Sequence, residues 1–167
     1  MSLEDLYTGV TKKLRVTRKR TDGSPSEKIL EINVKAGWKA GTKLTFKDEG
    51  DEIMPGRFQS IEFSIEEKPH ATFTREGDNL IYTQTITLAE ALTGFNKTIT
   101  TLDHRQIPLA SSSDAIVDPN TTRRIPNEGM PISKQPGRKG DLIVKFNVKF
   151  PTSLSSRQKE AIKSALV

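Results

Sequence analysis

An internal repeat limits the folds that are open to this chain. Residues 2–14 and 87–99 share, in the same order, a hydroxyl residue, a leucine, an acid, a Thr-Gly pair, a lysine and an aliphatic residue. In both copies the acid stands three positions after the hydroxyl residue, which is the pattern of a capping box at the start of a helix. Gly9 and Gly94 then suit the left-handed residue that follows a helix. Each copy therefore predicts one or two helical turns followed by a strand.

The rest of the chain is mainly short strands separated by turns. Alternation of apolar and polar residues predicts strands over 12–18, 29–34, 42–47, 60–65, 80–88, 97–102, 106–109 and 141–150. Hydrophobic residues make up 34 % of the chain, below the ~45–50 % typical of globular proteins, which favours thin layers over one thick core. We therefore predict a mostly β fold with two tandem small β-sandwich or half-barrel domains, each with a short helix, over residues 1–68 and 69–151.

Residues 152–167 differ, because they carry the only long helical pattern in the sequence. Ser155 can cap this helix, with Gln158 at its third position. Apolar side chains spaced by three and four residues form one stripe, which consists of Ala161, Ile162, Ala165 and Leu166. A helix this short is marginal alone, so its stripe needs a partner surface, either the second domain or another chain.

Composition excludes several classes of protein. The 167 residues include no cysteine and only two histidines, so we expect no disulfide framework, no thiolate nucleophile and no metal site. No apolar run approaches the ~18–20 residues of a membrane span, and the acidic start lacks the cationic part of a signal peptide. We therefore expect a soluble protein of a reducing compartment. The net charge of +5 favours an acidic partner, which could be nucleic acid, a membrane surface or an acidic peptide.

The most unusual segment is the basic run at 12–20, in which six of nine residues are cations. On a strand, Lys12, Leu14 and Val16 share one face, and Arg15 lies on the other. One interpretation is a solvated edge strand guarded by cations against aggregation. A second is a nucleic-acid surface, although aromatic residues are only 6 % and no base-stacking signature is present. A third is an edge that binds an acidic, extended peptide by strand addition.

Three other segments could suggest chemistry, but none has the required spacing. The glycines of 37–41 lack the spacing of a phosphate loop and predict a tight turn. Asp103 and His104 with the serines of 111–113 and Asp114 could be imagined as a hydrolase triad, but no glycine-framed nucleophile elbow is present. The acids of 48–52 miss the spacing of a calcium loop and predict a solvated turn. We therefore expect no enzyme activity, no catalytic residues and no cofactor.

Seven blocks of the sequence resemble the DnaJ family of co-chaperones, in family order and with family spacing. They are LEDLYTGVTKK at 3–13, GWKAGTKLTF at 37–46, KPHATFTREGDNL at 68–80, EALTGF at 90–95, TLDHR at 101–105, PNEGMP at 126–131 and GDLIV at 140–144. The resemblance covers essentially the whole chain and is to the C-terminal client-binding region of type II (class B) members. The chain lacks the family's His-Pro-Asp tripeptide, its Gly/Phe-rich linker and the cysteine zinc module of type I members. It also lacks the apolar strand that the family usually places just before Leu3, so one wall of the first domain's groove could be absent.

The resemblance implies a set of binding residues. The family's peptide groove maps onto Lys12, Leu14, Arg15, Val16, Lys28 and Phe63. Its apolar members are expected to form a depression, and its cations to attract the acidic C-terminal tail of a DnaK-type chaperone. The family's dimerisation segment maps onto residues 152–167, with Leu154 and the apolar stripe at the contact. The resemblance thus implies a cytoplasmic homodimer that binds unfolded polypeptides and does not bind membranes. A basic β module that binds nucleic acid remains the alternative.

Overall fold

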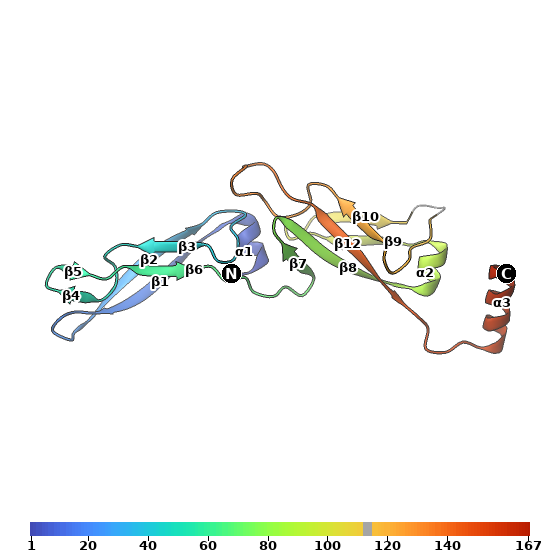
Figure 1. Ribbon diagram of the computed structural model, residues 1–167, viewed down its shortest axis with the longest axis horizontal. Coiled ribbons are helices and arrows are strands. Elements are labelled where there is room, and N and C mark those ends of the chain that lie inside the picture. Colours follow the sequence, from blue (N-terminus) through green and yellow to red (C-terminus); the bar gives the residue numbers. More distant parts are fainter. Residues whose placement is uncertain (112–114) are drawn as a thin grey trace.

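Two short helices mark the starts of the repeated segments in the computed structural model, which describes residues 1–111 and 115–167 (Figure 1). Helix α1 spans Leu3–Thr8 and helix α2 spans Leu88–Thr93. The Asp5 backbone N–H donates to the Ser2 hydroxyl at the start of α1. At the start of α2, Thr87 and Glu90 form a complete capping box. The repeated helix–strand unit predicted from the sequence is confirmed.

The glycines that end these helices have an unexpected conformation. Gly9 has φ 79° and ψ 152°, and Gly94 has φ 111° and ψ 161°. Positive φ is as predicted, but the extended ψ places both residues outside the left-handed helical region. This combination is reached almost only by glycine, because a Cβ would clash there. The glycines therefore redirect the chain straight from helix into strand, without a left-handed turn.

The first half of the chain forms three strand pairs. Its strands are β1 (Val10–Lys19), β2 (Pro25–Val34), β3 (Lys43–Phe46), β4 (Glu52–Met54), β5 (Arg57–Phe58) and β6 (Ile61–Ser64). Antiparallel pairs join β1 with β2, β3 with β6, and β4 with β5. The inner face of β2 buries Leu30, Ile32 and Val34, and Phe46 and Phe63 pack edge to face on the β3–β6 pair. In β2, β3 and β6 the alternation that predicted the strands is therefore an alternation of more buried and exposed side chains.

The second half contains a larger sheet. Its strands are β7 (Phe73–Glu76), β8 (Asn79–Thr87), β9 (Asn96–Thr100), β10 (Gln106–Ala110), β11 (Thr122–Ile125) and β12 (Leu142–Lys149). Four of them form a sheet in the order β11-β12-β8-β7, in which β8 and β12 are parallel, and β9 pairs with β10. Ile99, Leu109 and Val144 are almost fully buried between the two layers. The predicted fold class, mostly β with a short helix in each half, is confirmed.

Arg75 and Gly37 join the two halves. The Arg75 guanidinium donates to the carbonyl oxygens of Gly37 at 3.0 Å and Trp38 at 2.7 Å. Gly37 has φ 89°, and a Cβ there would lie 2.3 Å from the Pro131 carbonyl oxygen, so this turn requires glycine. The tight turn predicted at 37–41 is present, and it lies against the second half. The division into domains at 1–68 and 69–151 remains a prediction.

Helix α3 (Ser156–Leu166) begins as predicted, with a capping box between Ser155 and Gln158. It stands apart from the strands at the end of an extended segment, and none of its residues is buried (Figure 1). In the described residues the apolar stripe is therefore not covered by the second half, which was one of the two predicted partners. No helix in residues 1–111 and 115–167 is long and apolar enough to cross a membrane.

Candidate functional site

Strand β1 has one unpaired edge within the described chain, because its only partner strand there is β2. The Arg20 backbone N–H donates to the Ser24 carbonyl oxygen at 3.0 Å, so Arg20 and Ser24 are a hydrogen-bonded pair of the hairpin. Such positions alternate in an antiparallel pair, so the backbone groups of Lys13, Arg15 and Thr17 point to the free edge. These three residues offer unpaired donors and acceptors to an added strand.

Two acidic side chains close one end of this edge. The Lys19 backbone N–H donates to the Asp51 carboxylate at 2.7 Å, and the Thr21 N–H donates to Glu52 at 3.2 Å. Hydrogen bonds from the Thr21 hydroxyl and then its backbone lower the pKa of Glu52. Two of the acids predicted to lie in a solvated turn at 48–52 therefore also bind backbone donors of β1 and its turn, through hydrogen bonds that stay exposed.

The inner face of the β1–β2 pair carries most of the predicted groove residues. Direct register places Leu14 opposite Leu30 and Val16 opposite Lys28, so these four side chains share one face. Leu30 is buried, whereas Leu14 is 37 % exposed at the rim. Along β1 this face therefore carries one cation, Lys12, followed by two apolar residues, Leu14 and Val16.

A depression of about 280 Å³ lies beside this face. It is lined by Met1, Lys12, Leu14, Ile32, Val34, Phe63, Ser64, Ile65 and Glu66. Three predicted residues, Lys12, Leu14 and Phe63, meet in it. Val16 and Lys28 continue the same face but do not line it. The depression also contains Ile32, Val34 and Ile65, which were not predicted as groove residues. Alternation in 29–34 and 60–65 indicated that they face inward, but alternation cannot show which strands lie next to each other.

Arg15 lies on the opposite face of β1. It is opposite Ile29 in the register, is exposed, and lies 3.7 Å from the Glu27 carboxylate. The same outer face pairs Lys13 with Glu31 in the register. Cross-strand acids therefore offset part of the positive charge of this face. The alternation argument that separated Arg15 from Leu14 is confirmed.

The cations on the inner face all have acidic neighbours. Lys12 Nζ lies 3.7 Å from Asp5, and Lys28 Nζ lies 3.0 Å from Glu49 Oε2. Arg18 lies 3.7 Å from the same Glu49 oxygen, and its guanidinium is 4.5 Å from the centre of a phenylalanine ring on β5. Pairs as exposed as those of the two lysines contribute only about 0–1 kcal/mol each, so a ligand carboxylate can replace the internal acid at little cost.

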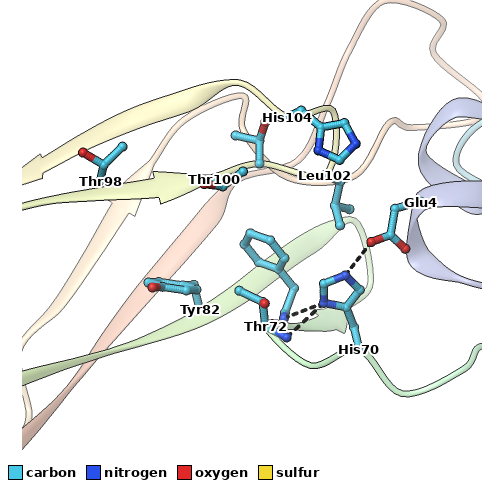
Figure 2. A pocket seen from close by; sticks show the side chains of 10 residues that line it. Glu4, His70, Thr72, Tyr82, Thr98, Thr100, Leu102 and His104 are labelled. Atoms are coloured by element: carbon cyan, nitrogen blue, oxygen red, sulfur yellow. Dashed lines mark hydrogen bonds and ion pairs between the residues drawn. The ribbon is translucent and has the colours of Figure 1, made fainter.

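A second cavity, of about 330 Å³, adjoins α1 and the second half and was not predicted (Figure 2). His70 Nδ1 accepts from the backbone N–H groups of Thr72 and Phe73 at 3.0 and 3.1 Å. The proton of a neutral imidazole must then be on Nε2, which donates to the Glu4 carboxylate at 2.7 Å. This hydrogen bond lowers the pKa of Glu4. His104 also lines the cavity.

The structure does not assemble the imagined hydrolase site from the residues it describes. Both oxygens of Asp103 are occupied, one by the Thr101 hydroxyl and the other by Arg105 Nε at 2.8 Å. Burial acts to raise the pKa of Asp103, but the hydrogen bonds from Arg105 and Thr101 outweigh it and lower the pKa to about 2. Residues 112–114 of that candidate lie outside the described residues. In the part of the chain that is described, no group of three or more His, Cys, Asp or Glu could hold a metal.

Residues 1–151 match the family model of the DnaJ C terminal domain, and the chain therefore belongs to this family. The similarity to type II members that the sequence blocks indicated is confirmed. Protein SIS1 of Saccharomyces cerevisiae is 44 % identical over 97 % of this chain and 46 % of its own length. Protein psi1 of Schizosaccharomyces pombe is 46 % identical over 96 % and 43 %, and human DnaJ homolog subfamily B member 5 is 42 % identical over 99 % and 49 %. The chain thus spans less than half the length of each of these relatives.

Proposed function

We propose that this chain is the peptide-binding part of a co-chaperone, in which β1 binds unfolded polypeptide segments and the acidic C-terminal tail of a DnaK-type chaperone. One observation carries the proposal. The free backbone edge of β1 runs beside an apolar depression, and cations stand at both ends of the same face. Backbone pairing, apolar pockets and positive charge are the three elements that recognise an extended acidic segment.

The hydrogen-bond pattern explains how Arg15 can belong to this site. A peptide strand added to β1 pairs with the backbone of Lys13, Arg15 and Thr17, whose side chains point outward. Its alternate side chains then lie beside Leu14 and Val16 on the inner face. Arg15 contributes its backbone to the ligand and its side chain to the rim. Because Asp51 occupies the next N–H along the edge, pairing ends at Thr17.

The proposal includes a homodimer formed through residues 152–167. The apolar stripe on α3 is exposed, with Ile162 at 41 % and Leu166 at 68 %, while Leu154 is half-buried before the helix. A second copy of this helix offers the same stripe, so a symmetric contact covers both. Two β1 edges on one dimer bind a long client more tightly than one edge alone, because the second contact is intramolecular.

We further propose that the protein is not an enzyme and that it acts in the cytoplasm. Its two β domains are residues 1–68 and 69–151. Nucleic acid is the less favoured ligand, because acids opposite the outward cations of β1 offset their charge. A short single strand and a short duplex are competitors in the binding experiment. Displacement of a bound acidic peptide at low concentration of either supports nucleic acid instead.

The test compares binding of a fluorescent acidic C-terminal peptide to the wild type and to Leu14→Asp. The new carboxylate lies beside the depression, and we expect affinity to fall about tenfold or more, from lost apolar contact and charge repulsion together. Lys12→Glu should cost only a few-fold, because an exposed pair contributes about 0–1 kcal/mol. Ile29→Asp is the matched control, because Ile29 is 62 % exposed on the outer face of the same strand pair. Equal affinities for the wild type and Leu14→Asp would remove the proposed site.

A further inference from the structure

Glu49 lies between two cations of the proposed site. Its Oε2 is 3.0 Å from Lys28 Nζ and 3.7 Å from Arg18 Nη1. This oxygen is buried but makes no hydrogen bond of good geometry within the described residues, so its contact with the cations is mainly electrostatic. A carboxylate held at a pair of cations without good hydrogen bonds is one that another carboxylate can replace.

The turn that carries Glu49 is fixed. Asp48 has φ 61°, and the Gly50 backbone N–H donates to the Gln59 carbonyl oxygen at 2.6 Å. A Cβ at Gly50 would lie 2.8 Å from that same oxygen, so the two segments approach as closely as glycine allows. The backbone therefore presents Glu49 to Lys28 and Arg18.

The position of this pair relates it to the ligand. Lys28 is opposite Val16 on the inner face of the β1–β2 pair, where alternate side chains of an added strand lie. The same face carries Arg18 two residues further along β1. A ligand carboxylate that reaches this end of the edge meets the two cations and Glu49 together.

We propose, on the basis of the proposed function, that Glu49 is an internal competitor for the acidic end of the ligand. In the free protein it pairs with Lys28 and Arg18 and offsets part of their charge, and an acidic ligand has to displace it. A single carboxylate gains little, because it exchanges one ion pair for another. Adjacent carboxylates gain more, because together they can contact both cations. Glu49 thus favours segments with clustered acids over segments with one, and leaves uncharged segments unaffected.

The test measures binding of two short synthetic peptides, one with adjacent glutamates at its C-terminal end and one with glutamines there. In Glu49→Gln we expect about two- to fivefold tighter binding of the glutamate peptide, the range set by one partly exposed ion pair. The glutamine peptide should bind unchanged. Glu62→Gln is the matched control, because it removes the same charge from an exposed pair with Lys43, 3.7 Å away, on the β3–β6 pair. We expect no gain there.

The outcomes separate this inference from the proposed function. If the wild type does not bind the glutamate peptide, the proposed function fails and this inference with it. If the wild type binds and Glu49→Gln binds equally or more weakly, only the competitor role is overturned, provided circular dichroism shows the variant folded. In a Lys28→Gln background the gain from Glu49→Gln should shrink. A full gain in that background means a general charge effect and also overturns the role.

Discussion

Arg75 provides the sharpest test of how the two halves are held together. Its guanidinium bonds the carbonyl oxygens of Gly37 and Trp38 in the first half and the Gly77 carbonyl oxygen within its own turn. Burial lowers the pKa of Arg75, with opposing effects from Glu67 and Asp78, but an arginine remains charged at any working pH.

The expected cost of Arg75→Ala follows from these bonds. A hydrogen bond from a charged donor contributes about 1.5–3 kcal/mol net, and two such bonds cross between the halves. The guanidinium is half-buried, so in the variant water can bond to part of the carbonyl oxygens that Arg75 leaves. We expect the free energy of unfolding to fall by about 2–4 kcal/mol, and the midpoint by roughly 4–16 °C. Arg75→Lys keeps the charge but reaches one carbonyl at most, so about half that loss is expected.

The assay is urea and thermal unfolding followed by circular dichroism. Arg123→Ala is the control, because among the described residues Arg123 donates only to the Ala110 carbonyl oxygen, inside the second half, and it is partly exposed. We expect it to cost about 1 kcal/mol. A loss below about 0.5 kcal/mol for Arg75→Ala is the size of an ordinary surface substitution and would mean that Arg75 does not hold the two halves together.

Two further predictions concern acid stability and assembly. The pKa of Asp103 is lowered from 3.8 to about 2 in the folded state, so its stabilising effect is present above pH 3.8 and is lost as the pH falls towards 2. Asp103→Asn should therefore reduce stability by about 1 kcal/mol at pH 6 but by much less at pH 2, and an equal loss at both values contradicts this. Ile162→Asp, or removal of residues 152–167, should convert a dimer into a monomer. In light scattering the Ile162→Asp monomer should have a mass of about 18.6 kDa. A wild type that already has this mass contradicts the dimer.

Local sequence patterns predicted the elements that depend on local chemistry. The caps at Ser2, Thr87 and Ser155 each require a hydroxyl and a partner three residues later, so they can be read directly. Long alternating strands such as β2 and β12 were equally clear. Strands β4 and β5 are too short for alternation to show, and β7 and β11 have few apolar residues. These four are defined by backbone pairing, of β4 with β5, of β7 with the next strand β8, and of β11 with the more distant β12.

The candidate site was predictable in its residue types but not in its arrangement. Alternation put Lys12 and Leu14 on one face, and β1 kept that arrangement. The approach of Phe63 depends on β6 and β1 facing the same depression, and the partner of Lys28 depends on the turn that carries Glu49. Both are tertiary contacts, and no spacing along the chain indicates them.

The two copies of the repeat can be compared residue by residue. Lys12 contacts Asp5, and the matching Lys97 contacts Glu90 at 3.0 Å, so this lysine–acid link accompanies the helix–strand unit in both copies. The residues that follow differ, because β9 has Thr98 and Thr100 where β1 has two cations. We therefore expect an anionic chain end to bind the edge of β1 rather than the edge of β9, so that binding saturates at one acidic peptide per chain. Titration calorimetry reads this stoichiometry directly.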